Sequence, residues 1–341
     1  MEKIGLFLIL LKEKWDNKDS YLKDVRFKVI VHKVKSFFVG ISIFVLLFGI
    51  SFIILYPLLY MLSVSFRVPE ELFDPSVVWI PKTFTLDNIK AVWDITSYPS
   101  AFIRTMSLAL LSTVCQCFTC SLVGYGFARF KFKGREVLFM GVLFTLIVPP
   151  QAITMPLYLN FVHFDFFGLG SIIQIFTGSK FDISIIDTIW PSTISAFFGL
   201  GIRAGLFIYI YRQFFRNMPL ELEEAAYIDG CKPFKTYIRV MLPNTGPVAL
   251  VTFLFSIVWY WNDFFYSALF FNKSRPLSVL VGNLAYILDT YRTDTGVALT
   301  FGQTLAYLQV ACLLFILPLL IMYIFLQRYF TQSIVRAGIV G

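Results

Sequence analysis

Six long apolar runs constrain the fold of this chain more than any other feature of its sequence. A helix needs about 20 predominantly apolar residues to cross a hydrocarbon core about 30 Å thick, and each run is long enough for that. Because backbone polar groups inside a bilayer need internal partners, helices are the expected form of these runs. The sequence predicts an all-α membrane protein with six transmembrane helices over residues 37–61, 103–127, 137–158, 190–214, 248–271 and 301–326.

The composition agrees with a membrane protein and excludes an ordinary soluble domain. Of the 341 residues, 57% are hydrophobic and only 15% are charged, whereas soluble domains carry about 25% charged residues. The formal net charge of +8 lies mainly between the apolar runs. Positive charge in such loops sets the topology of a membrane protein, so it does not indicate a nucleic-acid partner.

The distribution of lysine and arginine predicts which side of the membrane each loop occupies. Positive residues concentrate in residues 1–36 and in the loops after the second and fourth apolar runs. The segment 63–101 carries only three of them, Arg67, Lys82 and Lys90. By the positive-inside rule, the N-terminus and these two loops are cytoplasmic. Six spans then return the C-terminus to the cytoplasm as well.

The chain divides into a six-span domain at 37–327, a basic cytoplasmic N-terminal extension at 1–36 and a cytoplasmic C-terminal tail at 328–341. The short apolar run at 4–11 cannot span a membrane. A long charged segment follows it in place of a cleavage site, so it is not a signal peptide. The extension is either a helix on the inner membrane surface or a partly disordered tail.

Three of the five cysteines, Cys115, Cys117 and Cys120, lie close together in the second apolar run. On a helix Cys115 points away from Cys117, and neither histidine of the chain is near them in sequence. We therefore interpret them as small packing residues and expect no metal site.

The stretch 223–243 predicts a short helix, a turn and a second short helix between the fourth and fifth apolar runs. Pro219 suits the first turn of a helix, and the glutamates that follow suit its positive end. Gly230 favours a left-handed stop. Pro233 opens a second helix that Pro243 ends. Both helices are too short and too polar to cross a membrane.

The spacing inside this stretch is specific. Glu224-Ala225-Ala226 is followed after three residues by Gly230; nine residues later come Val240, one further residue, and Leu242-Pro243. This spacing resembles the EAA loop of permease subunits of ABC importers, in which an isoleucine occupies the position of Val240. An EAA triplet alone would carry little weight, but the whole spacing between two apolar runs is diagnostic.

Other segments resemble the maltose-type permeases that take up carbohydrates. Trp190-Pro191-Ser192 and the sequence RQFFRNMP at 212–219 resemble their fourth span, and Trp261-Asn262-Asp263-Phe264-Phe265 resembles their fifth. Gln327-Arg328-Tyr329-Phe330 resembles the end of their sixth span. The resemblance extends over residues 37–341 and leaves the basic extension outside it.

The resemblance implies the fold of a type I ABC importer permease and a role as a non-catalytic membrane subunit. Such a subunit pairs with a sister permease as a heterodimer, in the plasma (inner) membrane of a bacterium. Two cytoplasmic ATPases would use ATP and Mg²⁺, and an extracellular solute-binding protein would deliver a sugar. The loop 217–243 would couple to the ATPases through Glu224, Ala225, Ala226, Asp229, Gly230, Leu242 and Pro243.

Two segments depart from the family pattern. The connection 163–189 is longer than the usual one between the third and fourth spans, and we expect it to lie outside, on the side from which the binding protein docks. The tail 336–341 reads RAGIVG in place of the GAVKG-like run that reaches toward the ATPases, which weakens the expectation of a tail contact.

Two charges lie deep in the predicted spans. Arg203 is ten residues from Gln213, about 15 Å along a helix, and Asp263 is sixteen residues after Pro247, about 24 Å. Charges at such depth usually face a cavity or a partner. Alternatively the two form a structural ion pair, and the tryptophans are interface anchors. The candidate substrate path comprises Arg203, Trp259, Trp261, Asn262, Asp263, Pro150 and Gln151.

Two alternative functions stay open at this point. One is an importer permease for another small polar solute, and the other is a stand-alone ion-coupled carrier. Such carriers often contain internal repeats and broken helices; the sequence has the Pro149-Pro150 break but no repeat. No phosphate-binding GxxxxGK[ST] loop and no catalytic arrangement of side chains is present, so we do not expect an enzyme.

Overall fold

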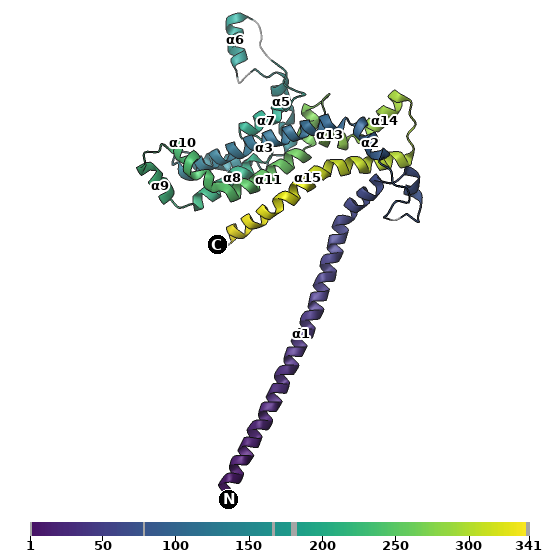
Figure 1. The fold of residues 1–341 in the computed structure, drawn as a ribbon. Helices are drawn as coiled ribbons and strands as arrows, with labels where there is room; N and C mark the ends of the chain where they lie inside the picture. Colours follow the sequence, from purple (N-terminus) through teal and green to yellow (C-terminus); the bar gives the residue numbers. More distant parts are fainter. Residues whose placement is uncertain (1, 78, 166–167, 179–182, 339–341) are drawn as a thin grey trace. The chain divides into compact units, whose positions relative to one another are not determined.

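The computed structural model describes the chain apart from residues 1, 78, 166–167, 179–182 and 339–341 (Figure 1). Among the described residues the regular elements are helices, and the only strand-like pairings are two isolated bridges, Arg67 with Phe84 and Phe164 with Ile183. The chain forms two compact units, Met1–Met61 and Leu62–Gly341.

The first unit consists of most of helix α1 (Glu2–Ser65). The helix is continuous from the basic extension through the first predicted span, so residue 36 is not a break in the backbone. Its part from His32 onward is long and apolar enough to cross a membrane. The phenylalanines of this part, including Phe44 and Phe48, are exposed, as expected of a surface that contacts lipid.

Helix α3 (Tyr98–Arg129) is the centre of the second unit. It packs against α7 (Trp190–Phe197), α8 (Ala204–Asn217) and α11 (Gly246–Asn262), while α15 (Phe301–Gly338) packs against α11. The packing of α3 on α8 is close, because a Cβ at Gly124 would lie 3.0 Å from the backbone nitrogen of Arg212.

Three of the predicted spans are broken helices. The third is divided into α4 (Arg135–Phe144) and α5 (Pro150–Val162), because Pro149 is extended and Pro150 starts a new helix. The fourth is divided into α7 and α8, and the fifth into α11 and α12 (Phe265–Phe270).

By length and composition, three described helices qualify as single membrane spans: His32–Ser65, Tyr98–Arg129 and Phe301–Arg328. A fourth is added if the pair Pro233–Met241 and Pro243–Asn262, bent by 41°, is one span. The fold is therefore a helical membrane fold, as predicted, and the count of six spans stays a prediction.

Short helices lie near both ends of α3. Near its N-terminal end lie η1 (Pro69–Phe73), α2 (Asp87–Ile95), α13 (Leu277–Gly282) and α14 (Leu284–Thr295) (Figure 1). Near its C-terminal end lie α9 (Glu221–Ile228), α10 (Pro233–Thr236), the π-helical turn η2 (Tyr237–Met241) and η3 (Pro243–Thr245). Helix α6 (Leu169–Thr177) belongs to the long connection 163–189.

A buried arginine joins α8 to α4. The Nη2 atom of Arg212 lies 2.9 and 3.1 Å from the two carboxylate oxygens of Glu136, and its guanidinium lies 3.7 Å from the centre of the Phe139 ring. Hydrogen bonding from Arg135, together with the charge of Arg212, lowers the pKa of Glu136. Arg212, the first residue of the RQFF segment, thus contacts α4, the first helix of the third predicted span.

Candidate translocation and coupling sites

The break between α7 and α8 places Arg203 differently from the prediction. Arg203 is not inside a continuous helix: it has a left-handed backbone with φ of 57° and directly precedes α8. The preceding Gly199 also has a left-handed backbone, with φ of +73°. The continuous helix was wrong because the backbone is left-handed at Gly199 and again at Arg203, a conformation that interrupts an α-helix.

Two buried side chains hold the backbone of this break. The Gln116 amide donates to the Ile202 carbonyl at 2.7 Å, and the Ile202 N–H donates to the Tyr260 hydroxyl at 3.3 Å. The Tyr260 hydroxyl in turn donates to the Gln116 side-chain oxygen at 2.5 Å. Irregular backbone inside a membrane is tolerated only where its polar groups find such partners. We call Gln116, Ile202 and Tyr260 the clamp.

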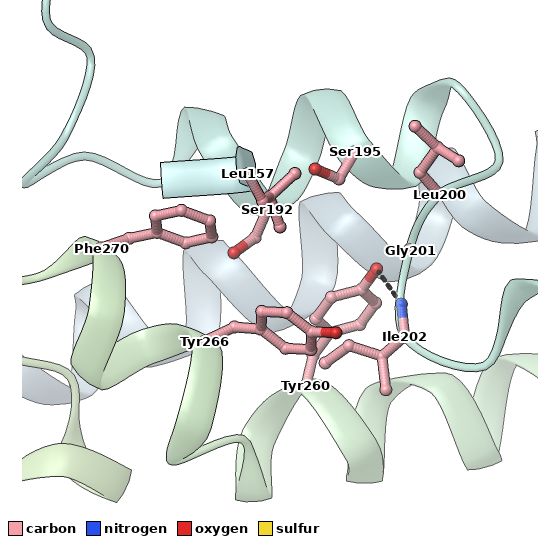
Figure 2. Close-up of a pocket in the computed structure, with 9 residues that line it drawn as sticks. All are labelled: Leu157, Ser192, Ser195, Leu200, Gly201, Ile202, Tyr260, Tyr266 and Phe270. Carbon is pink, nitrogen blue, oxygen red and sulfur yellow. Dashed lines mark hydrogen bonds between the residues drawn. The ribbon is translucent and has the colours of Figure 1, made fainter. Parts of the chain in front are cut away.

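A small hollow of about 20 Å³, room for about one water molecule, lies beside the clamp. Tyr260 and Tyr266 lie opposite Ser192 and Ser195 of α7 across this hollow (Figure 2). Its remaining lining residues are Leu157, Leu200, Gly201, Ile202 and Phe270. The hollow thus combines hydroxyl groups with aromatic faces and contains no charged side chain, a chemistry suited to a neutral hydroxylated solute.

Asp263 has a local role that the sequence interpretation did not specify. Its carboxylate accepts hydrogen bonds from the backbone N–H groups of Tyr266 at 3.1 Å and Ser267 at 2.8 Å, and from the Ser267 hydroxyl at 2.9 Å. It therefore caps the N-terminus of α12. The ion pairs of the described residues do not include Arg203 with Asp263, so the predicted structural pair is not formed.

The other candidate path residues divide between core and surface. Trp261 is buried, and its indole N–H donates to the Phe315 carbonyl at 3.2 Å, so it is a core residue and does not line a path. Trp259 is partly buried and packs against Phe207 with ring centres 5.3 Å apart. The remaining candidates, Pro150, Gln151, Arg203 and Asn262, are exposed.

Sequence reasoning missed the clamp and the hollow. Gln116 is an uncharged polar residue deep in the second apolar run, and that position is a usable signal because buried amides need partners. Tyr260 was expected to add an aromatic face to the candidate path beside Trp259 and Trp261, but no local pattern predicts its contact with residues 116 and 202.

The predicted helix–turn–helix at 223–243 is confirmed. Helix α9 ends before Gly230, whose φ is +77°, and the Cys231 N–H returns to the Ala226 carbonyl at 2.9 Å. Pro233 then starts α10, and Pro243 follows the π-helical turn. We call residues 217–243 the coupling loop.

The coupling loop has a buried face and an exposed face. Ala226 is only 5% exposed, whereas Glu224, Ala225 and Asp229 are exposed. Large apolar side chains share the exposed face: Ile228 is 85% exposed and Phe234 is 59% exposed. Of the remaining assigned positions, Gly230 and Pro243 are exposed and Leu242 is partly buried.

The buried face contains an ion pair that sequence reasoning also missed. The Arg129 Nε lies 3.0 Å from the Glu223 Oε1, and both side chains are less than a tenth exposed. Burial raises the pKa of Glu223, and the charge of Arg129 opposes this shift. Glu223 therefore faces the protein, while the adjacent Glu224 faces solvent.

Among the residues that the structure describes, no group of three or more His, Cys, Asp or Glu side chains is close enough to hold a metal ion. All five cysteines are free thiols, and Cys120 is fully buried. Cys120 lies in a hydrophobic core cluster, as expected of a packing residue.

Comparison with known proteins gives consistent similarities. A family model described as binding-protein-dependent transport system inner membrane component matches residues 121–336. The chain is 30% identical over 308 residues to Protein LplC of Bacillus subtilis (strain 168), covering 86% of this chain and 92% of that protein. It is 26% identical over 314 residues to the probable starch degradation products transport system permease protein AmyC of Thermoanaerobacterium thermosulfurigenes, covering 92% and 98%.

The fold is similar to that of a solved ABC transporter chain. That chain comes from a bacterial ABC transporter involved in the import of the acidic polysaccharide alginate; the TM-score is 0.67 at 20% sequence identity, covering 85% of this chain and 96% of that one. The helical membrane fold, the EAA spacing on an exposed helix–turn–helix and the family match over residues 121–336 agree. This chain belongs to the family of inner membrane components of binding-protein-dependent transport systems.

Proposed function

We propose that this chain is a permease subunit of an ATP-driven importer in the plasma membrane of a bacterium. It would form half of the translocation path with a sister permease. A solute-binding protein would deliver the solute from outside, and two cytoplasmic ATPases would bind ATP and Mg²⁺ and drive the cycle. Family membership is the observation that carries this proposal.

The proposed solute is a sugar or an oligosaccharide. Similar proteins are named for the transport of starch degradation products and of arabinooligosaccharides, and another is named for alpha-glucosides. The hollow beside the clamp supports this choice only by the chemistry of its lining, hydroxyl groups and aromatic faces, because its volume of about 20 Å³ does not hold a sugar ring. Another small polar solute is the second candidate, because the hollow contains no group specific for a sugar.

The proposed topology has six spans with both termini in the cytoplasm. The positive residues after α3 and after α8 support cytoplasmic loops at these points. The broken helices α4–α5, α7–α8 and α11–α12 would each count as one span. The sister permease, or the path between the two subunits, would then lie against the exposed residues Gln151, Arg203 and Asn262.

The coupling loop is the proposed ATPase docking site. Its exposed face places Ile228 and Phe234 in solvent beside Glu224 and Asp229. Apolar side chains this exposed on a polar loop favour a protein partner. Leu220, Leu222 and Ile238 of the same loop are exposed as well.

The docking proposal is tested by placing a charge in this surface. In the complex with both ATPases, Ile228→Asp should raise the dissociation constant of the ATPases at least tenfold, because an aspartate in an apolar interface loses its hydration. Ile80→Asp is the matched control, since Ile80 is 81% exposed but lies outside the coupling loop. Equal co-purification of the ATPases with the Ile228→Asp variant and with the unmodified chain would refute docking at this loop.

A further inference from the structure

The last turns of α3 present three side chains to the coupling loop. Ser121, Tyr125 and Arg129 are spaced by four residues and therefore share one face of the helix. All three contact the loop or its flanks. The exposed docking surface of the loop is on the other side, at Glu224 and Ile228.

Arg129 holds the first half of the loop. Its Nε lies 3.0 Å from the Glu223 carboxylate, and its Nη2 donates to the Met218 carbonyl at 2.7 Å. One guanidinium thus holds both the entry to α9 and its first turn. The Arg129 Nε and the Glu223 Oε1 form an ion pair without a hydrogen bond between them. Removal of either partner would leave a buried charge unpaired, which is costly.

Ser121 and Tyr125 hold the second half of the loop. The Ser121 and Tyr237 hydroxyls are 2.5 Å apart, and both residues are buried. The Tyr125 ring lies 5.2 Å from the ring of Tyr237 and 5.3 Å from that of Phe215. Both short helices of the loop are therefore fastened to α3.

The same helix also holds the break beside the hollow. Gln116 of the clamp is five residues before Ser121, about 8 Å along α3. No non-helical residue separates the two contacts, and the close packing at Gly124 joins this part of α3 to α8. A displacement of the coupling loop is thus transmitted through one rigid element to the Gln116–Ile202 contact.

We propose that the inner half of α3 is the lever that carries movement of the coupling loop to the α7–α8 break, and that Arg129 and Glu223 are the positioning pair that fastens the loop to it. This inference rests on the proposed docking of ATPases at the loop. Glu223 and Glu224 therefore have different roles. Glu223 transmits the movement of the coupling loop to α3, whereas Glu224 faces the ATPase.

The test uses the assembled importer, with the sister permease and both ATPases, in proteoliposomes. The variants are Glu223→Gln, Arg129→Gln and the charge exchange that combines Glu223→Arg with Arg129→Glu. Arg216→Gln and Lys133→Gln are the controls, because both residues are exposed and lie outside the coupling loop. The measured quantity is the ratio of ATP hydrolysis with and without the purified binding protein, loaded with whichever of maltotriose, arabinotriose and galacturonic acid trimer it retains.

The two single variants should retain their ATPases and their unstimulated hydrolysis, while the stimulation ratio falls at least fivefold. The charge exchange should restore at least half of the ratio, and the controls should match the unmodified complex. An unchanged ratio in Glu223→Gln overturns the lever. A single variant that loses its ATPases, or whose total activity falls at an unchanged ratio, also overturns it, because the pair would then serve assembly alone.

Failure of the lever and failure of docking give different results. If the Ile228→Asp complex keeps its ATPases, the proposed docking site is wrong. If Ile228→Asp loses them while Glu223→Gln keeps a normal stimulation ratio, docking stands and only the lever is wrong.

Discussion

Gly201 lies in the tightest part of the clamp. A Cβ at this position would overlap the Gln116 side-chain oxygen and the Tyr260 hydroxyl, and would lie 3.0 Å from the Ala196 Cα. The absence of a side chain at residue 201 therefore lets both polar groups reach Ile202. Any side chain at residue 201 would therefore displace Gln116 or Tyr260 from the clamp.

Gly201→Ala should disrupt the clamp. Overpacking of this kind costs about 1–3 kcal/mol, so we expect a lower midpoint of thermal unfolding and a loss of transport. Gly126→Ala is the control, because a Cβ there meets nothing within 4 Å and alanine is the better helix former. A Gly201→Ala chain as stable and as active as the Gly126→Ala chain would contradict the clamp.

Gly230 is important for its backbone conformation, because a side chain at this position would not clash with any neighbour. Its φ is +77° and a Cβ would meet nothing within 4 Å. Asparagine tolerates this conformation, whereas a β-branched residue does not. Gly230→Val should therefore weaken ATPase binding about tenfold, the equivalent of about 1.4 kcal/mol, and Gly230→Asn should bind almost normally. Equal affinities measured for the two variants would show that the left-handed turn does not position the loop.

Among the elements, one carboxylate joins two connecting segments of the second unit. Asp187 accepts hydrogen bonds from the backbone N–H groups of Asn272 and Lys273, both at 2.7 Å, and of Ser274 at 3.4 Å. Burial acts to raise the pKa of Asp187, but these hydrogen bonds outweigh it and hold the pKa below its ordinary value. The connection 163–189 is thereby joined to the start of the segment 272–300.

The amide protons of Asn272 and Lys273 report on this contact. The pKa of Asp187 is lowered in the folded state. Its contribution to the free energy of unfolding is therefore fully present when the pH is above the ordinary pKa of aspartate, about 3.9. The contribution is lost as the pH falls through the folded value. Hydrogen exchange, corrected for intrinsic rates, should show protection at pH 6 that disappears on acidification.

Two variants separate charge from shape at this position. Asp187 has φ of 61°, a conformation that asparagine tolerates. Asp187→Asn should keep the backbone but reduce protection of the two amides and remove its dependence on pH, and Asp187→Ala should abolish protection. Protection that is unaffected in both variants would rule out the carboxylate as the anchor.

The elements also show what the sequence could predict. The positions of the apolar helices and the helix–turn–helix followed from local signals, since Pro233, Pro243 and Gly230 act on their own backbone. The break at Arg203 was missed, because membrane helices often tolerate glycine without unwinding. The clamp joins residues 116, 202 and 260, and the Arg129–Glu223 pair joins residues 94 positions apart; no local pattern encodes such contacts.

For the whole molecule, the six-span topology predicts the side of each loop. In a cysteine-free background, Lys133→Cys, after α3, should react with an impermeant thiol reagent only when cells are opened. Ser171→Cys, in the connection 163–189, should react in intact cells. Both residues are exposed, so burial does not limit the reaction. The reverse pattern would invert the topology, and reaction of both in intact cells would remove a span.

ATP-driven uptake tests the function of the whole molecule most directly. Proteoliposomes would contain this chain, its sister permease and both ATPases, with ATP inside and the binding protein outside, loaded with the radiolabelled oligosaccharide that it retains. The account predicts accumulation inside the vesicles only when ATP and the binding protein are both present. Accumulation driven by an ion gradient, by this chain alone and without either of them, would contradict the importer and favour a stand-alone carrier.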